Sequence, residues 1–442
     1  MMMHLYRRLP EIKSEWKATT VTEVYRKGLC IGCGICAIAC SSKAITMKRS
    51  KSMGLMVPDV DSEICTKCGA CLEVCFGYEV ASGRELESMS IDGDPIIGYY
   101  IHAYAGATLD QELRQKSASG GLVTNLLAYA FKESLIDGAL VTSMTPGILP
   151  VPQAFIATSR TALLKSTGSK YAPVSFNGAL NMIDTDRRYA VVGLPCHIYA
   201  LRKLSAINRR IGTSLLLYFG LLCGGMPNLL GIEYLLDRHG FRKCYINSIR
   251  YRDGQWPGNL WIMGKCGTTK KHVSVPYPDY WQGADRYFLT TRCSLCHDGF
   301  NESSDISFGD LWLPEESRGF QKSLLIVRTE QGDNLIQSAT DSSHIRLSSL
   351  DNPDILKSQQ GLVDFKFLNL SGRIRTSRQL GRPLPKFEKN QLPPPSIRSY
   401  LKAIDIYLGM ALASKRKLWF LLRVFIKLKR YLAAAASLTL KK

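Results

Sequence analysis

Apolar residues in the middle of the chain form short runs that alternate with amphipathic stretches. Residues 122–135 have helical spacing and end at the turn Asp137-Gly138. Three short apolar runs, at 139–141, 189–192 and 214–219, predict buried strands, and residues 198–204 predict a helix after the second run. Strands that alternate with helices indicate a largely parallel or mixed sheet with helices on its faces.

Two of these predicted strands end close to a cysteine. Cys196 follows the strand at 189–192, and Cys223 follows the strand at 214–219. Because ligands of such sheets gather at the carboxyl ends of the strands, we expect the two cysteines to meet at one edge. A more β-like region follows, with predicted strands at 246–252, 260–264 and 323–328.

The C-terminal segment has a second kind of pattern. On a helix of 100° per residue, Arg416, Arg423, Lys427 and Arg430 share one face, whereas the other face is apolar, with Leu418, Leu421, Phe425, Leu428 and Leu432. Charges interrupt the segment too often for a membrane-spanning helix. We expect a basic amphipathic helix that lies in the interface of an anionic membrane, or packs on the body or on a partner.

These patterns divide the chain into four parts. The first is a cysteine-rich module at residues 22–82, discussed below, and a linker around Asp92-Gly93-Asp94-Pro95 follows it. A larger body covers residues 95–240 and 241–385, an extended linker covers 383–395, and the basic helical tail covers 396–442. The expected fold class is α+β and α/β: a small N-terminal module, a mixed-sheet α/β body and a C-terminal basic helix.

Composition and charge narrow the class of protein. With 442 residues, of which 45% are hydrophobic, the chain is long enough for a sizeable core. Its net charge is +20, and residues 396–442 carry eleven basic residues against one acid, Asp405. Because no zinc-finger, RNA-recognition or helix-turn-helix pattern accompanies this charge, we expect no nucleic acid as a partner.

Eight of the fourteen cysteines repeat one motif, Cys-x2-Cys-x2-Cys-x3-Cys. The spacing is typical of two [4Fe-4S] clusters, in which the fourth cysteine of each motif binds the cluster of the other. The expected ligand sets are Cys30, Cys33, Cys36 and Cys75 for the first cluster, and Cys65, Cys68, Cys71 and Cys40 for the second. Disulfides and zinc sites are the alternatives, but disulfide frameworks suit short secreted chains, and zinc sites usually pair two distant Cys-x2-Cys motifs. We expect a cytoplasmic location, because free thiolates and iron-sulfur assembly need a reducing compartment.

The run resembles the bacterial two-cluster ferredoxin module, with one difference. Such motifs usually carry proline after the fourth cysteine, where this chain has Ser41 and Phe76. The small residues Gly32, Gly34 and Gly69 inside the loops fit a backbone that directs N–H groups at sulfur.

Six cysteines lie outside the module. Cys244 and Cys266 occur in ordinary segments, where a cysteine is most often a small core residue. The other four lie at strand ends or in a Cys-x2-Cys pair, namely Cys196, Cys223, Cys293 and Cys296. From the residues alone, these four are compatible with a third cluster, a four-cysteine zinc site or scattered thiols.

Several short stretches of the body together resemble the coenzyme F420 hydrogenase/dehydrogenase beta subunit family. They are 119–124 (SGGLVT), 168–171 (GSKY), 193–196 (GLPC), 256–258 (WPG), 293–296 (CSLC) and 305–312 (DISFGDLW). The resemblance covers about residues 25–385. The resemblance implies a domain that binds FAD and a further [4Fe-4S] cluster. In this chain the ligands of that cluster would be Cys196, Cys223, Cys293 and Cys296.

Local chemistry is compatible with a flavin site. Ser117, Ser119, Gly120 and Gly121 precede the helix at residue 122, where backbone N–H groups and the helix dipole favour a pyrophosphate, although a plain Ser/Gly turn is the alternative. Lys170, with its neighbour Tyr171, could pair with a phosphate or with reduced flavin, or be a solvated lysine.

Five further residues stay outside the expected catalytic set. His197 and His297 adjoin expected ligands, but such histidines more often hydrogen-bond a sulfide or the backbone than relay protons. By analogy, Arg250, Arg252 and Asp310 could bind substrate or cofactor.

The sequence therefore predicts an iron-sulfur flavoprotein oxidoreductase. Electrons would pass between the [4Fe-4S] clusters and FAD, which exchanges a hydride with coenzyme F420 or another organic substrate; the expected partners are a redox protein or ferredoxin and this small molecule. One alternative is an electron-transfer subunit with no substrate of its own. Another is a basic binding protein whose clusters are structural.

Overall fold

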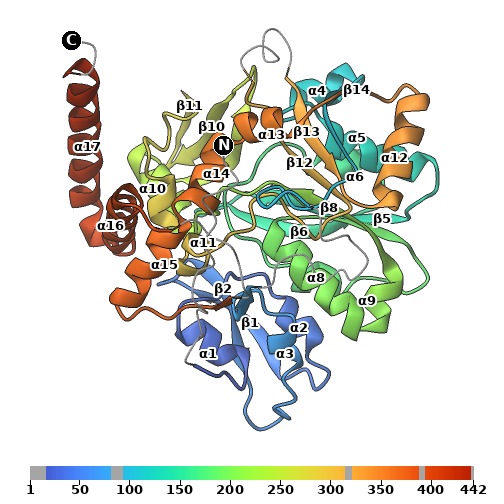
Figure 1. Cartoon of the computed structure of the whole chain (residues 1–442), viewed down its shortest axis with the longest axis horizontal. Coiled ribbons are helices and arrows are strands. Elements are labelled where there is room, and N and C mark those ends of the chain that lie inside the picture. Colours follow the sequence, from blue (N-terminus) through green and yellow to red (C-terminus); the bar gives the residue numbers. More distant parts are fainter. Residues whose placement is uncertain (1–15, 81–92, 314–320, 388–393, 440–442) are drawn as a thin grey trace.

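The computed structural model describes residues 16–80, 93–313, 321–387 and 394–439. Figure 1 shows a small N-terminal module in blue, a larger body built on a central sheet, and a C-terminal helical hairpin in red at the edge of the molecule. The expected fold class is confirmed.

The central sheet has eight strands. Their spatial order is β14 (Ile345–Ser349), β4 (His102–Thr108), β13 (Ser323–Val327), β12 (Ile306–Asp310), β8 (Leu215–Leu221), β7 (Tyr189–Gly193), β5 (Gly138–Thr145) and β6 (Val151–Ala157). Strands β5, β7, β8 and β12 are parallel neighbours, and β13 is antiparallel to both β12 and β4. The carboxyl ends of β4, β5, β7, β8 and β12 therefore share one edge.

Alternating side chains divide the core between the two faces of the sheet. Ala190 packs with α5 (Leu122–Lys132) and α12 (Glu330–Asp341) on one face, whereas its neighbour Val191 packs with α8 (Pro195–Ile207) on the other. The remaining helices of the body are α4 (Gln111–Lys116), α6 (Arg160–Leu164), α7 (Asn177–Leu180), α9 (Arg209–Ser214), α10 (Leu229–Arg238), η2 (Asp285–Phe288), α11 (Thr291–Ser294), α13 (Asn352–Ser358), α14 (Gln360–Val363), the π-helix η3 (Asp364–Leu368) and α15 (Leu370–Gln379).

The predicted elements occur with shifted ends. The helix expected at 122–135 ends at Lys132, because Ser134 adopts a left-handed conformation with φ of 52°. The strands expected at 139–141 and 214–219 extend to Thr145 and Leu221.

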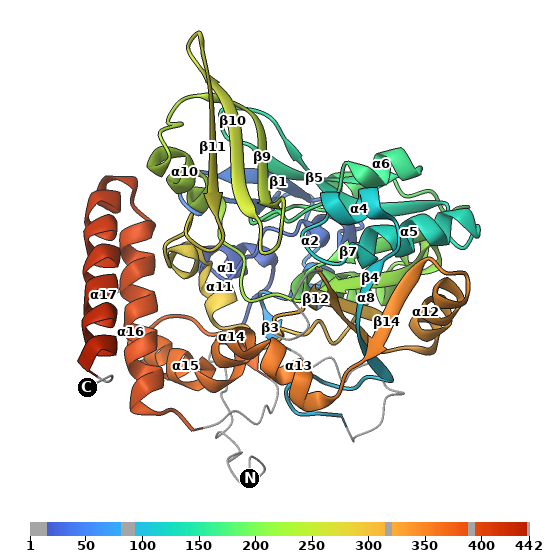
Figure 2. The same cartoon turned by 90° about the horizontal axis from the view of Figure 1, so that it is seen from above.

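The body contains a second, antiparallel sheet, separate from the central sheet. It consists of β9 (Tyr245–Asp253), β10 (Asn259–Cys266) and β11 (Thr269–Pro276), as Figure 2 shows. Cys244 lies in the core and Cys266 packs against it, as expected, but the sequence analysis did not predict that the two form a disulfide. The β9–β10 register explains the pairing: Lys265 lies opposite Tyr245, so the adjoining cysteines meet at the end of the hairpin.

The N-terminal module contains α1 (Val21–Arg26), α2 (Ile35–Ala39), β1 (Ile45–Ser50), β2 (Leu55–Val60), α3 (Ala70–Glu73) and β3 (Glu79–Val80). Backbone hydrogen bonds join it to the body: Phe176 donates to the Cys33 carbonyl over 2.8 Å, and Leu229 donates to the Gly54 carbonyl over 2.9 Å. Part of the linker expected at 383–395 is ordered structure instead, because β15 (Lys386–Phe387) pairs with β3; residues 388–393 and Asp92 lie outside the described residues.

The C-terminal tail is a helical hairpin of α16 (Ile397–Ala413), η4 (Arg416–Leu418) and α17 (Trp419–Thr439). Helix α17 packs on the body, as one of the sequence alternatives expected, but through Trp419, Leu422 and Ile426, which the helical pattern did not identify as the buried face. Ion pairs reinforce the contact, with 2.6 Å between Arg416 and Glu233 and a close pair between Arg423 and Asp237. Within the described residues, none of the helices combines the length and the apolar character that crossing a membrane requires.

Candidate functional site

The structure brings the members of each predicted cysteine group together. Set one comprises Cys30, Cys33, Cys36 and Cys75. Burial raises the pKa of the Cys30 thiol, and the negative charges of Cys75 and Cys33 raise it further. The Cys36 thiol is also close to other members of the set, and burial raises its pKa well above the ordinary value. Metal binding would have to displace the protons of these thiols.

Set two comprises Cys40, Cys65, Cys68 and Cys71, which line a single hollow in the module. Cys40 belongs to the first sequence motif but faces this hollow with the second motif, as the crossed arrangement requires. Cys68 is exposed, so this hollow opens to solvent.

Left-handed glycines shape the cysteine loops of the module. Gly32, Gly34 and Gly69 have φ of 80°, 75° and 83°, and the Gly32 N–H donates to Cys30 Sγ over 3.4 Å. A Cβ on Gly34 would lie 2.2 Å from Ser175 Oγ of the body, so glycine is also required for the close approach of module and body.

Set three comprises Cys196, Cys223, Cys293 and Cys296. Cys196 lies in the first turn of α8 just after β7, Cys223 follows β8, Cys293 lies in α11 and Cys296 follows it. Burial raises the pKa of Cys196 well above its ordinary value, and the negative charges that add to this effect are those of Cys293, Cys223, Cys33 and Cys296. Two predicted strand ends and the Cys-x2-Cys pair therefore meet at the carboxyl edge of the sheet.

Four thiolates can hold either a single zinc ion or a cubane cluster. Four thiolates that bind four irons of one cubane lie farther apart than four thiolates that bind one zinc ion. In the described part of the chain, no three His, Cys, Asp or Glu side chains converge closely enough to hold a single metal ion. The cysteine sets fit the wider cubane in donor type and number.

Sets one and three are neighbours. Cys33 of set one is among the residues whose negative charge reaches Cys196. Between the sets, the Phe76 and Tyr199 rings meet edge to face with centroids 5.3 Å apart, and Cys296 packs in the same apolar cluster. The order in space is therefore set two at the surface, set one inside the module, and set three at the sheet edge.

The two histidines beside set three are buried. Burial lowers the pKa of His197 to about 4 and that of His297 to about 3. His197 Nδ1 accepts the Leu194 N–H over 3.4 Å, and its ring lies on Phe176. This arrangement fits the expected hydrogen-bonding role for His197.

Asn301 is a site residue that sequence reasoning missed. It is fully buried, its φ is 61°, and its side-chain amide donates to the Gly193 and Leu221 carbonyls over 3.0 and 3.2 Å. These carbonyls end β7 and β8, the strands that precede two ligands of set three. The Asn301 segment itself follows Cys296, so one amide ties three ligand-bearing segments together.

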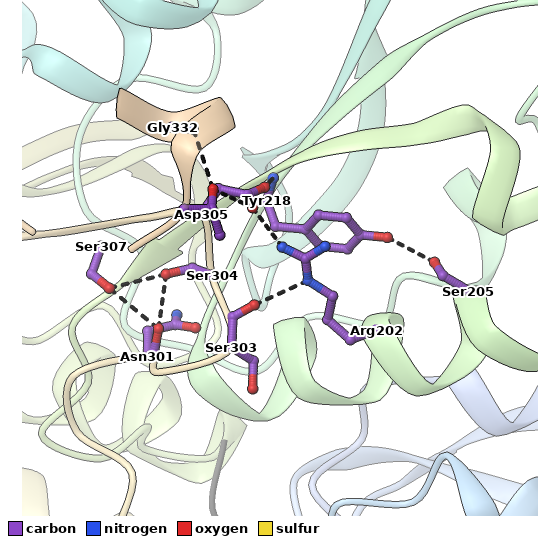
Figure 3. Close-up of polar contacts among 10 residues, drawn as sticks. Arg202, Ser205, Tyr218, Asn301, Ser303, Ser304, Asp305, Ser307 and Gly332 are labelled. Carbon is purple, nitrogen blue, oxygen red and sulfur yellow. Dashed lines mark hydrogen bonds and ion pairs between the residues drawn. The ribbon is translucent and has the colours of Figure 1, made fainter. Parts of the chain in front are cut away.

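A polar network surrounds Asn301, as Figure 3 shows. The Asn301 carbonyl accepts from Ser304 Oγ over 2.8 Å and from Ser307 Oγ over 3.2 Å. Beside it, Arg202 of α8 donates to the Ser303 carbonyl and pairs with Asp305 over 2.7 Å. The network thus fixes α8, which carries Cys196, to the loop after Cys296; the sequence signal available was only the Ser/Asn-rich stretch at 301–307.

The predicted flavin residues Ser117, Ser119, Gly120 and Gly121 lie between β4 and α5 at the same carboxyl edge. Ser119 Oγ and Ser323 Oγ are 2.9 Å apart, and a Cβ on Gly120 would lie 2.4 Å from the Gly106 carbonyl oxygen. Gly121, with φ of 76°, is the N-cap of α5, and as a glycine it has no side chain to cap the helix. The first-turn N–H groups of α5 therefore keep the arrangement that favours a phosphate. The Ser117 hydroxyl, in contrast, donates to the Leu113 carbonyl.

Lys170 and Tyr171 have different surroundings. Lys170 Nζ donates to the Thr167 and Gly168 carbonyls, both over 2.9 Å, and burial lowers its pKa to about 7. Burial raises the pKa of Tyr171 to about 12, whereas the charge of Arg252 and its hydrogen bond to Tyr171 oppose this rise. In this structure Lys170 thus caps a turn, whereas Tyr171 faces the arginine.

Arg252 and Asp310 form the polar centre of an aromatic cluster at the end of β12. Their ion pair measures 2.7 Å, and the Arg252 guanidinium lies 4.6 Å from each of the Trp256 and Tyr277 ring centroids and 5.1 Å from that of Trp312. Asp310 pairs in the sheet with Ser323, the partner of Ser119. A series of contacts therefore runs from Ser119 through Ser323, Asp310 and Arg252 to Tyr171. Lys170 lies outside this series. Arg250, in contrast, lies on the exposed side of β9 over Trp261.

Comparisons with known proteins agree with this architecture. Residues 29–76 match a 4Fe-4S dicluster domain, residues 103–181 match the N-terminal domain of the coenzyme F420 hydrogenase/dehydrogenase beta subunit, and residues 186–353 match its C-terminal domain. The predicted iron-sulfur clusters of the module are thus confirmed.

Two relatives and one solved structure illustrate the similarity. The coenzyme F420 hydrogenase subunit beta of Methanococcus voltae is 27% identical over 300 residues, which cover 65% of this chain and 99% of that protein. The coenzyme F420-dependent sulfite reductase of Methanocaldococcus jannaschii is 26% identical over 351 residues, which cover 78% of this chain and 50% of that protein. A chain of the F420-reducing [NiFe] hydrogenase complex from Methanosarcina barkeri shares the fold, with a TM-score of 0.52, 18% identity and coverage of 67% of this chain and 99% of that chain.

The expected class of protein, an iron-sulfur oxidoreductase, is likewise confirmed. The chain belongs to the coenzyme F420 hydrogenase/dehydrogenase beta subunit family.

Proposed function

We propose that this protein passes electrons between ferredoxin-type [4Fe-4S] clusters and FAD, and that FAD exchanges a hydride with an organic substrate. One observation carries the proposal: set three and the predicted flavin residues other than Lys170 lie at one edge of the sheet, and the dicluster module is docked beside them. A bound flavin would supply the conversion between single electrons and a hydride, which carries two. The names of the relatives favour coenzyme F420 as the hydride partner.

Residues of this chain would have separate tasks in that function. The exposed position of Cys68 makes set two the side that a redox partner reaches. Set one lies between set two and set three, so the three sets form a row toward the sheet edge. At the edge, the start of α5 would hold the pyrophosphate of FAD, and the cluster around Arg252 would orient the ring system.

The alternative is an electron-transfer subunit that feeds a partner enzyme. The relative from Methanococcus voltae is itself named as a subunit, which favours a complex with other chains. The two functions differ in one property: only the proposed oxidoreductase would exchange a hydride with a small molecule on its own flavin.

Anaerobic purification followed by iron, sulfide, zinc and flavin analysis tests the cofactor content. We expect about twelve irons and one FAD per chain, because twelve cysteines occupy three sets of four. Cys196→Ser and Cys293→Ser should each retain about eight irons, whereas Cys244→Ser, which breaks only the disulfide of the β9–β10 hairpin, should retain twelve. A full flavin complement with eight irons in the wild type, or one zinc in place of the third cluster, would contradict the assignment.

We also propose that the C-terminal hairpin docks on an anionic membrane. Its two helices carry large apolar side chains that face outward: Ile397, Leu401, Ile404 and Leu408 on α16, and Phe420, Leu421, Val424, Leu428, Tyr431 and Leu432 on α17. This surface adjoins exposed basic residues, among them Lys415 and Lys417 at the turn and Lys427 and Arg430 on α17. Apolar side chains flanked by lysine and arginine match the interface of an anionic bilayer, where each basic residue contributes about 1 kcal/mol.

Point variants test this contact better than a deletion. Removal of residues 396–442 would uncover the core, because Tyr407 is buried and its hydroxyl donates to the Arg373 carbonyl. The combined change Leu421→Gln, Val424→Gln and Leu428→Gln alters only exposed side chains. We expect the wild type to bind phosphatidylglycerol vesicles but not phosphatidylcholine vesicles, and the triple variant to bind neither. Absence of binding by the wild type at low salt, or a wild-type dimer that the triple change disrupts, would refute the membrane contact.

A further inference from the structure

Two buried cations lie against the cysteine sets. Lys366, in the π-helix η3, is 2% exposed and donates a side-chain hydrogen bond to Cys296. Its positive charge also interacts with Cys223 and Cys293, so one ammonium group faces three members of set three. The π-helix η3 comes after the set-three cysteines in the chain, and Lys366 lies on its buried side.

Arg292 lies between set one and set three. The residue is fully buried, its Nε donates to the Phe76 carbonyl over 2.8 Å, and its guanidinium stands 4.0 Å from the Phe76 ring centroid. Phe76 follows Cys75, and the charge of Arg292 favours the Cys75 thiolate. The two terminal guanidinium nitrogens have no hydrogen-bond partner among the described residues.

Among the residues that the structure describes, few negative charges lie close enough to balance these cations. Asp298 is buried near Lys366, but its carboxylate accepts the Asn301 N–H, and burial raises its pKa. Arg373, a third buried cation near Cys296, donates to the Ser294 and Asn369 carbonyls. A buried cation without a charged partner is costly, so a negative centre is required beside Lys366 and Arg292. A cubane with four thiolates is such a centre.

We propose that Lys366 and Arg292 raise the reduction potentials of the clusters beside them, Lys366 that of the third cluster and Arg292 those of the first and third. The inference rests on the proposed function of set three. Reduction adds one negative charge to a cluster, and a nearby cation in a water-poor interior stabilises the reduced form more than the oxidised form. Because Lys366 and Arg292 act on set three, with Arg373 near Cys296, whereas only Arg292 acts on set one, the third cluster becomes the better electron acceptor of the two.

A redox titration followed by electron paramagnetic resonance under anaerobic conditions tests the proposal on the holoprotein. In Lys366→Met, we expect the equilibrium constant for reduction of the third cluster to fall at least tenfold, which corresponds to about 59 mV for one electron. Lys366→Arg should restore most of the loss, and Arg292→Met should lower the potentials of both the first and the third cluster. The matched control is Lys357→Met, which removes the same charge from an exposed position on α13.

The outcomes separate this inference from the proposed function. A wild type with eight irons would refute the third cluster itself. A wild type with twelve irons and an unchanged potential in Lys366→Met would refute only the role of the lysine. Loss of the third cluster in Lys366→Met would assign Lys366 to cluster assembly and would also overturn the proposal.

Discussion

Replacing Asn301 should release the third cluster while the dicluster module keeps its iron. The perturbation we choose is Asn301→Gly, because glycine adopts φ of 61° without strain and the change therefore isolates the side-chain amide. The amide nitrogen holds the carbonyl ends of β7 and β8 in the interior, and two ligands of set three follow these ends.

The size of the effect follows from the lost contacts. Each neutral hydrogen bond contributes about 1 kcal/mol, and each buried acceptor left without a donor costs about 1–3 kcal/mol. Two carbonyl acceptors lose their amide donor, so we expect Asn301→Gly to destabilise the local structure by about 2–6 kcal/mol. Asn301→Asp, which has nearly the same shape, should cost more, because a carboxylate oxygen would then face the two carbonyl oxygens.

Release of iron to a chelator is the direct assay. We expect about eight of twelve irons to remain in Asn301→Gly, with the electron paramagnetic resonance signals of the dicluster module unchanged. Asn125→Ala is the matched control, because it removes one partly buried hydrogen bond, to the His344 carbonyl over 2.7 Å, on the opposite face of the sheet. If Asn301→Gly releases iron no faster than the wild type and this control, the proposed positioning role of Asn301 is wrong.

Two other changes test separate parts of the structure. Gly34→Ala should loosen the module from the body and slow electron transfer to the flavin. The control Gly28→Ala has a similar φ of 70° but open space around it, so it should cost only about 1 kcal/mol of strain. Equal electron-transfer rates in the two variants would refute the close approach at Gly34. Burial lowers the pKa of Lys170 to about 7 in the folded protein, so between pH 7 and about 10.5 the unfolded chain binds one more proton than the folded chain. As the pH rises through this window, the wild type should therefore gain about 1–3 kcal/mol of stability relative to Lys170→Met. Melting temperatures of both proteins measured across that range check this sign, and a constant difference would show that the carbonyl partners keep the ammonium group charged.

The sequence was most informative where the functional residues lie close together along the chain, as in the cysteine motifs. The cysteine motifs indicate their own partners, and the apolar runs locate β5, β7 and β8 to within a few residues. From these strands the meeting of Cys196 and Cys223 could be predicted, because parallel strands share one carboxyl edge.

Long-range contacts could not be predicted in the same way. The pairing of Cys244 with Cys266 depends on the register of a hairpin, and the role of Asn301 depends on a left-handed residue that reaches two distant strands. The tail shows another limit: α17 is apolar on two sides, and only the packing shows that Trp419, Leu422 and Ile426 face inward while Leu421, Leu428 and Leu432 face outward.

The most direct test of the proposed function is to mix the anaerobic, fully loaded protein with reduced coenzyme F420. We expect the flavin absorbance to bleach and reduced [4Fe-4S] signals to follow in the wild type. In Cys196→Ser, the flavin should bleach at a similar rate while the dicluster signals appear much more slowly. Bound flavin that stays oxidised in the wild type with this and other hydride donors would contradict hydride exchange and favour an electron-transfer subunit without a substrate of its own.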